Sequence, residues 1–199
     1  EMGSVLVAFS GGVDSALVLQ QAHKVLGDNA TALTAISPSF PPEEQEQAVS
    51  FARKIGVRHI LIHSNEIDVE GYVQNAGNRC YFCKSELFDL AQKKARSMGI
   101  RWVADGTILD DLGDHRPGLE AAKENDVRHP LVEAGLDKPA VRHFAKDLGL
   151  SVWNKPSFAC LGSRIPVGTR VTRENLGAVQ RVESLLRIMG FHQFRARWH

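Results

Sequence analysis

Apolar and polar positions alternate in blocks along the first half of the chain, and these blocks predict strands that alternate with helices. Four short apolar runs are typical of buried strands, at residues 5–9, 31–36, 57–62 and 100–104. Between them, apolar residues at helical spacing predict helices over residues 16–26, from Pro41-Pro42 onward, and over 84–98. This order predicts an α/β fold with an open parallel sheet, which binds ligands at the carboxyl ends of its strands.

The second half of the chain is less regular. An acidic loop with Gly and Pro follows Asp105, and the pattern then predicts a short helix over residues 139–148 and a long connection over 157–172. An amphipathic helix is expected over 173–189 and a strand over 191–198. We therefore expect two domains, 1–157 and a small α+β domain at 158–199. The second is expected to be incomplete at its C-terminus, because its strand has no partner.

Composition narrows the class of protein. The 199 residues are 43% hydrophobic and 24% charged, which excludes a disordered chain. No apolar run approaches the ~20 residues that span a bilayer, and no basic leader precedes the first strand, so a cytoplasmic protein away from membranes is expected. Three cysteines are too few, and odd in number, for a disulfide framework.

Charge is distributed unevenly although the net charge is only +1. Residues 101–126 carry seven acidic and three basic side chains, whereas residues 164–199 carry seven Arg and two Glu. These stretches indicate either a metal-binding surface and a surface for a phosphorylated ligand, or two unrelated solvated faces. The net charge alone gives no reason to expect nucleic acid.

The strongest motif, Ser10-Gly11-Gly12-Val13-Asp14-Ser15, lies between the first strand and the first helix. Its glycines let the backbone approach phosphate oxygens, and its serines and the free N–H groups of the new helix are hydrogen-bond donors. Asp14 is a candidate ligand for Mg²⁺ on those phosphates. The alternative is a tight turn without ligand. The motif resembles the PP-loop of ATP pyrophosphatases, which implies cleavage of ATP between the α- and β-phosphates and transfer of AMP.

A second polar group follows the fourth predicted strand, at Asp105-Gly106-Thr107, with Asp110, Asp111 and Asp114 beyond it. Because this is the carboxyl end of a strand, these residues are candidates to bind the nucleotide, hold a second metal or orient the substrate. A solvated acidic loop is the alternative.

The three cysteines lie in two places. Cys80 and Cys83 form a C-x-x-C pair just before the helix predicted from Lys84, and Cys160 lies in the long connection. A pair at a helix N-terminus favours either a thiol of lowered pKa or two metal thiolates. All three together match an iron–sulfur site with one open iron position, and buried core cysteines are the alternative.

The segment from Lys155 to Thr169 resembles the signature of LarE-type ATP-dependent sulfur transferases. The similarity extends over essentially the whole chain, through the segments 78–84, 105–107, 116–118 and 129–131. It implies biosynthesis of the nickel-pincer cofactor of lactate racemase, by adenylation of a carboxylate of pyridinium-3,5-biscarboxylic acid mononucleotide and its conversion to a thiocarboxylate, done twice. It also implies a homo-oligomer.

The resemblance implies roles for single residues. Asp14, Ser15 and Cys160 are expected to be catalytic. Cys160 would either give up its own sulfur or hold, with Cys80 and Cys83, a 4Fe–4S cluster that presents sulfide from an unknown donor, and three cysteines favour the cluster. The expected anchors for the mononucleotide are Arg164, Arg195 and Arg197, and Glu183 matches a position that can contact metal.

Two other functions remain compatible with the motifs. Another PP-loop enzyme, a tRNA thiolation enzyme or an amidotransferase such as GMP synthetase, would share the first motif, although tRNA would require a broader basic face. A binding module for a nucleotide or an iron–sulfur cluster, without catalysis, would release no pyrophosphate.

Overall fold

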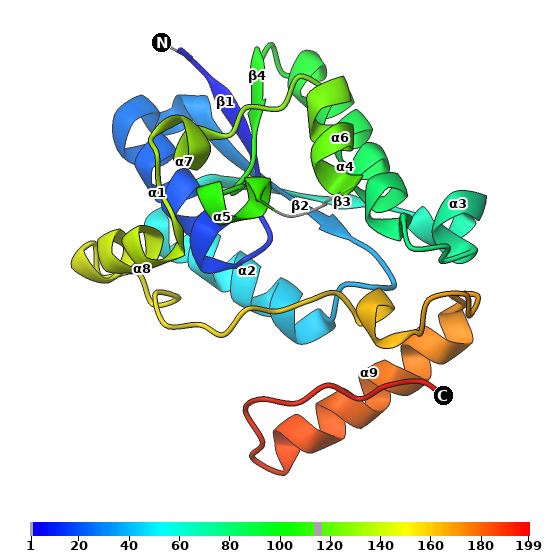
Figure 1. Ribbon diagram of the computed structural model, residues 1–199. Coiled ribbons are helices and arrows are strands. Elements are labelled where there is room, and N and C mark those ends of the chain that lie inside the picture. Colours follow the sequence, from blue (N-terminus) through cyan, green and yellow to red (C-terminus); the bar gives the residue numbers. More distant parts are fainter. Residues whose placement is uncertain (1, 114–116) are drawn as a thin grey trace.

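A four-stranded parallel sheet forms the centre of the computed structural model, which describes residues 2–113 and 117–199. The strand order is β3-β2-β1-β4, and every neighbouring pair is parallel (Figure 1). The strands are β1 (Val5–Ala8), β2 (Ala30–Ile36), β3 (Arg58–His63) and β4 (Trp102–Ala104). This confirms the predicted α/β class and all four predicted strands.

Helices cover both faces of the sheet. The longer ones are α1 (Val13–Leu26), α2 (Pro42–Ile55), α4 (Arg79–Ser97), α6 (Pro117–Glu124), α8 (Lys138–Asp147) and α9 (Arg173–Ile188). Single turns are formed by η1 (Gly27–Asn29), η2 (Glu66–Asp68), α3 (Glu70–Val73), α5 (Leu109–Leu112), α7 (Pro130–Glu133) and η3 (Leu161–Arg164).

Successive side chains of β1 point into two different hydrophobic cores, because neighbouring residues of a strand face opposite sides of the sheet. Val5 and Val7 of β1 belong to the core that includes buried residues of α1, α2 and α8. Leu6, between them, belongs to the core formed with α4 and α6. The residues of both cores are almost fully buried, and β1 pairs directly with β4, so the carboxyl ends of these two strands are fixed next to each other.

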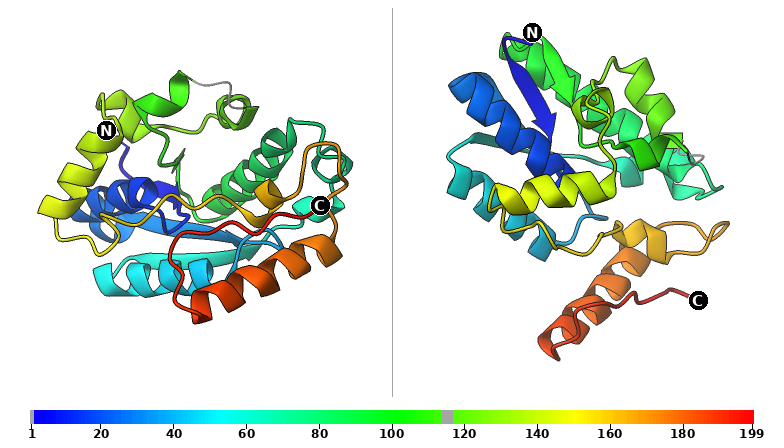
Figure 2. Two further views of the ribbon diagram at one scale, coloured as in Figure 1. Left: turned by 60° about the horizontal axis from the view of Figure 1, so that its bottom comes forward. Right: turned by 60° about the vertical axis from the view of Figure 1, so that its left-hand side comes forward.

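A third hydrophobic cluster attaches the C-terminal part of the chain. Tyr72 and Val73 of α3 pack with Leu161, and with Leu176 and Val179 of α9. In addition, α9 lies beside the start of α2, where Glu43 accepts a 2.6 Å hydrogen bond from Ser184 (Figure 2). The predicted boundary between residues 157 and 158 stays a prediction.

The predicted strand over residues 191–198 is wrong. This segment runs in an extended path without pairing to any strand of the described residues. It is held by backbone N–H groups, because Ala196 N donates to Glu183 at 3.2 Å and Trp198 N donates to Arg164 O at 3.1 Å. The alternation of side chains predicts the two faces of the segment, but it does not specify a strand with which the segment could pair.

Two element boundaries also differ from the sequence prediction. The helix predicted from Lys84 is α4, and it begins at Arg79. The C-x-x-C pair therefore lies inside this helix and not in front of it. The stretch after Asp105, predicted as a loop, contains α5, α6 and α7. Among the helices described, none has the length and apolar character needed to cross a membrane.

Candidate functional site

The turn between β1 and α1 has the geometry of a phosphate-binding loop. Gly11 has a φ of +75°, and a Cβ there would lie 3.2 Å from Ala48 Cβ, so this position requires glycine. Gly12 precedes α1, and no side chain of the described residues caps the helix. The first N–H groups of α1 are therefore available to an anion.

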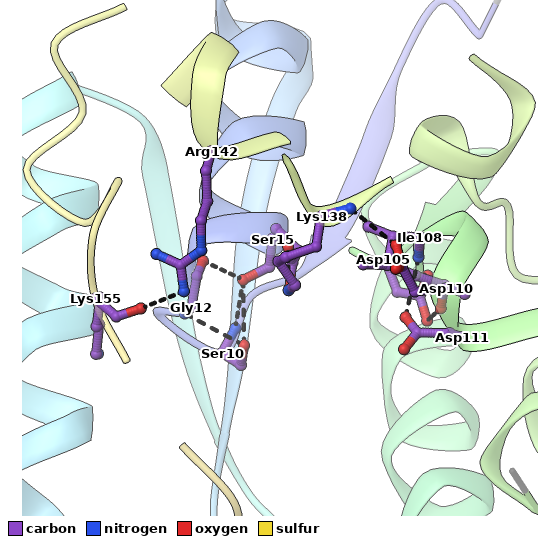
Figure 3. A network of polar contacts seen from close by, with 12 residues as sticks. Ser10, Gly12, Ser15, Asp105, Ile108, Asp110, Asp111, Lys138, Arg142 and Lys155 are labelled. Carbon is purple, nitrogen blue, oxygen red and sulfur yellow. Dashed lines mark hydrogen bonds and ion pairs between the residues drawn. The ribbon is translucent and has the colours of Figure 1, made fainter. Parts of the chain in front are cut away.

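Two serines close this loop. The hydroxyl groups of Ser10 and Ser15 lie 3.2 Å apart, and Ser15 Oγ donates to Gly12 O at 3.2 Å (Figure 3). Both hydroxyl groups therefore lie beside the N-terminus of α1, and each can turn its hydrogen toward a phosphate oxygen bound there.

The segment after β4 packs directly on this loop. A Cβ on Gly106 would lie 2.5 Å from Ser15 N, an impossible approach, so only glycine fits there. Asp105, one residue earlier, accepts hydrogen bonds from Thr107 N at 3.0 Å and Thr107 Oγ1 at 2.9 Å. The predicted nucleotide-binding residues Asp105, Gly106 and Thr107 thus lie beside the predicted loop.

Asp105 is also bound to His129, whose Nδ1 lies 2.8 Å from Oδ1. Burial by itself raises the pKa of Asp105, but the hydrogen bond from His129 and the nearby Lys84 outweigh it and lower the pKa overall. The same hydrogen bond raises the pKa of His129. The pair keeps Asp105 ionised, and a hydrogen-bonded carboxylate has few free lone pairs for a metal.

Two lysines that sequence reasoning did not single out reach the loop, one from the first residue of α8 and one from the segment that follows this helix. Lys138 Nζ contacts both carboxylate oxygens of Asp14, at 2.7 and 2.6 Å. Lys155 Nζ donates to Gly11 O at 3.2 Å and to the buried Glu44 at 2.7 Å. In Figure 3 the two lysines lie on either side of the serines. Both cations are placed to neutralise phosphate charge.

Further contacts fix these lysines. Asp110 accepts a hydrogen bond from Lys138 N at 2.8 Å, and Arg142 donates to Lys155 O at 3.0 Å (Figure 3). Arg142 also donates to Trp153 O at 2.9 Å, which ties the middle of α8 to the segment that carries Lys155. Asp111 accepts from Ile108 N at 3.0 Å, and Asp114 and Arg116 lie outside the described residues.

Burial changes the pKa of two of the three thiols, those of Cys83 and Cys160. It raises the pKa of Cys83 to about 12, with a contribution from the charge of Glu66. It also raises the pKa of Cys160, although Arg79 and Arg164 partly offset that rise. For Cys83, burial therefore overrides the lowered thiol pKa that was one interpretation of the C-x-x-C pair.

The three thiols are neighbours but are not gathered around one point. Cys80 and Cys83 stand one turn apart on α4. The charges of Cys80 and Cys160 would raise the pKa of Cys83, and the charge of Cys80 would raise that of Cys160. Cys80 is exposed and the other two are partly buried. Among the described residues no set of three or more His, Cys, Asp or Glu is close enough to hold a metal ion.

Two residues predicted to bind ligands bind each other. Arg164 Nε donates to Glu183 at 2.7 Å, and both side chains are nearly fully buried. The same guanidinium donates to Ala159 O at 2.6 Å and Cys160 O at 3.2 Å. Arg164 therefore fixes the backbone that carries Cys160. Arg195 and Arg197, in the extended C-terminal segment, are exposed.

Comparison with known proteins agrees with this geometry. The family model described as NAD synthase matches residues 1–104. The chain is 49% identical to an uncharacterised protein of Synechocystis over 99% of its length and 74% of that protein. It is 38% identical to the pyridinium-3,5-bisthiocarboxylic acid mononucleotide synthase of Lactiplantibacillus plantarum, over 100% of this chain and 72% of that enzyme. A tRNA-specific 2-thiouridylase of Halothermothrix orenii is 29% identical, over 78% of this chain and 54% of its own.

Proposed function

Because this chain belongs to the family of the pyridinium-3,5-bisthiocarboxylic acid mononucleotide synthase, we propose that it converts carboxylates of pyridinium-3,5-biscarboxylic acid mononucleotide to thiocarboxylates. It is an ATP-dependent sulfur transferase of nickel-pincer cofactor biosynthesis. The observation that carries the proposal is the loop at residues 10–15, with Gly106 packed against Ser15 and Lys138 on Asp14.

The first chemical step is adenylation. A substrate carboxylate oxygen attacks the α-phosphorus of ATP, the bond to the β-phosphate breaks, and pyrophosphate leaves with its electrons. The N–H groups at the start of α1 and the cations of Lys138 and Lys155 stabilise the charge that develops on pyrophosphate. Ser10 and Ser15 add hydroxyl donors to the same phosphates.

Asp14 is the residue that would hold Mg²⁺. Its carboxylate is engaged by Lys138, so Asp14 would be free to hold the ion only when Lys138 turns to the phosphates that also attract it. When Mg²⁺ is bound it would neutralise phosphate charge. Asp14 fits this role because it is partly exposed and projects from the first turn of α1.

In the second step a sulfur anion attacks the acyl carbon of the adenylate, and AMP leaves as the carbon–oxygen bond to its phosphate breaks. Cys160 is the residue assigned to this step. It lies in a loop whose backbone Arg164 holds, and Arg79 and Arg164 add positive charge near the thiol.

Cys80, Cys83 and Cys160 would together hold a 4Fe–4S cluster. The donor type fits, since iron–sulfur clusters are held by thiolates, and the thiols are near enough for their charges to affect one another's pKa. Among the described residues they are not gathered as a set of metal ligands, so a cluster would require them to move closer together. When bound, the cluster would supply an open iron position for an external sulfide. The alternative source is the sulfur of Cys160 itself, which would leave dehydroalanine.

Exposed arginines would anchor the substrate. Arg195 and Arg197 project from the extended C-terminal segment, where a guanidinium can bind a phosphate or carboxylate with two hydrogen bonds. Arg164 would act differently from this prediction, by positioning Cys160. Glu183 could contact a metal only after losing its ion pair with Arg164.

Self-association is also part of the proposal. The outer face of α9 and the turn after it leave Leu185, Ile188, Met189 and Phe191 exposed, with 52–82% of each residue accessible. Exposed apolar residues of this number are typical of an interface. We therefore expect a homo-oligomer, which sedimentation analysis would detect.

The test of the sulfur source is anaerobic purification followed by turnover with substrate, ATP, Mg²⁺ and sulfide. The cluster is supported if the protein contains iron and acid-labile sulfide, if Cys80→Ala loses them, and if turnover leaves the protein mass unchanged. Loss of one sulfur from the protein, without iron, would support Cys160 as the donor. Thiolated tRNA, or no product from the mononucleotide, would contradict the proposed function.

A further inference from the structure

The hydroxyl group of Tyr72 is buried without a partner. Tyr72 lies on α3 and is 1% exposed, and its Oη has no hydrogen-bond partner in the part of the chain that the structure describes. The neighbouring Ser39 donates its own hydrogen to Glu66 at 2.6 Å. Because buried polar groups are nearly always hydrogen-bonded, an unpartnered hydroxyl at this place points to a group that binds there during function.

The hydroxyl faces the loop that carries Cys160. A Cβ on Gly162, two residues beyond Cys160, would lie 2.8 Å from Tyr72 Oη, so any larger residue would occupy the space in front of the hydroxyl. Burial raises the pKa of Tyr72 and the charge of Cys160 raises it further, although the nearby Ser39 side chain partly offsets the rise. The group therefore stays protonated beside two thiols and remains a donor.

Arg79 fixes the tyrosine and this loop relative to each other. Its guanidinium carbon lies 5.9 Å from the centre of the Tyr72 ring, and its Nη1 donates to Gly162 O at 2.6 Å. The same nitrogen donates to Asn75 Oδ1 at 2.8 Å. The donor hydroxyl is thus held in place before any ligand binds, which is the condition for effective electrostatic stabilisation.

We propose that the Tyr72 hydroxyl donates a hydrogen bond to the sulfur anion carried at Cys160. This inference rests on the proposed function, since it concerns the atom that attacks the acyl adenylate. The acceptor is either the Cys160 thiolate or a sulfide held beside it, and both present the same chemistry to a hydroxyl donor. Tyr72 would then be a catalytic residue for sulfur transfer and have no part in adenylation.

The test compares Tyr72→Phe with Tyr81→Phe. The chain has two tyrosines, and Tyr81 donates its hydroxyl to Glu124 at 2.7 Å at the surface, so Tyr81→Phe is a matched control. We expect Tyr72→Phe to slow thiocarboxylate formation in a single turnover by about tenfold or more, because a charge-assisted hydrogen bond is lost. ATP–pyrophosphate exchange should stay within about twofold of wild type. Tyr81→Phe should change neither rate.

A second measurement separates the two acceptors and does not depend on turnover. Slower alkylation of Cys160 by iodoacetamide in Tyr72→Phe, at about pH 8, identifies the Cys160 thiolate as the acceptor. Unchanged alkylation with slow sulfur transfer identifies the sulfide. If the wild-type chain forms no thiocarboxylate, the proposed function fails, and the alkylation rate alone then supports or overturns the role of Tyr72.

Gly162→Ala provides a second variant that retains the tyrosine. Its methyl group would displace the hydroxyl, so we expect the same selective loss of sulfur transfer as in Tyr72→Phe. Unfolding midpoints establish that each variant is folded. Equal losses in exchange and sulfur transfer, or no loss of sulfur transfer in either variant, would overturn the inference.

Discussion

Lys138 Nζ binds both carboxylate oxygens of Asp14, at 2.7 and 2.6 Å, across 124 positions of sequence. The residue expected to hold Mg²⁺ is thus neutralised by a residue suited to bind phosphate. When ATP binds, its phosphates would attract Lys138 and leave the Asp14 carboxylate able to hold Mg²⁺. The ion pair keeps the carboxylate in place until then.

We expect Lys138→Met to slow adenylation about 100-fold, as is typical when a group that stabilises transition-state charge is removed. The measurement is ATP–pyrophosphate exchange at saturating substrate. Lys93→Met is the control, because Lys93 forms an exposed ion pair with Asp89 on α4. A Lys138→Met enzyme that exchanges at the wild-type rate would remove Lys138 from the mechanism.

Gly106→Ala should destabilise the fold by about 1–3 kcal/mol, the usual cost of overpacking. The added methyl group would meet Ser15 N at 2.5 Å and push the segment after β4 away from the loop. Urea unfolding measures the loss, and ATP binding should weaken with it. Gly113→Ala, where a Cβ meets nothing within 4 Å, should change neither quantity.

Glu183→Gln should destabilise the protein by about 3–5 kcal/mol, because it leaves the Arg164 charge buried and unpaired. Glu133→Gln breaks an exposed ion pair with Arg128, and we expect it to cost less than about 1 kcal/mol. Urea unfolding of both variants provides the comparison. Equal effects would mean that the buried pair does not hold the Cys160 loop.

The Asp105–His129 pair makes stability depend on pH. Because the pKa of His129 is raised on folding, the residue stabilises the fold below about pH 6.5. This stabilisation is lost as the pH rises through the pKa that His129 has in the folded protein. Because the pKa of Asp105 is lowered on folding, the residue stabilises the fold above about pH 4. This stabilisation is lost as the pH falls through the pKa that Asp105 has in the folded protein.

The difference in unfolding free energy between wild type and His129→Gln should therefore be largest between about pH 4 and 6.5 and shrink on both sides. His143→Gln is the control, since His143 forms an exposed contact with Asp147. A difference that stays constant from acidic to alkaline pH would show that the pair is not ionised as described.

The sheet and the phosphate-binding loop could be predicted because their signals are local. Buried runs such as 5–9 fold as strands, and glycines soon after a strand permit the positive φ and the close backbone approach that a phosphate-binding turn requires. α6 was missed because its eight residues span too few turns to show a period. The strand expected at 191–198 was wrong because alternation specifies faces but no pairing partner.

The partners of the site residues could not be predicted. Lys155 reaches Gly11 across 144 positions, and Arg164 meets Glu183 only because η3 and α9 fold onto one cluster. Such contacts depend on the packed fold and leave no spacing in the sequence. The structure brings two of the motif positions, Asp14 and Gly106, next to each other, while their role in binding a nucleotide stays a prediction.

The most direct test of the central claim is exchange of radiolabelled pyrophosphate into ATP, with and without pyridinium-3,5-biscarboxylic acid mononucleotide and without any sulfide. Adenylation is reversible before sulfur attacks, so we predict exchange that requires the mononucleotide and Mg²⁺ and is lost in Asp14→Asn. Exchange that proceeds equally without the mononucleotide, or none in its presence, would contradict the assignment of this chain as an enzyme that adenylates that substrate.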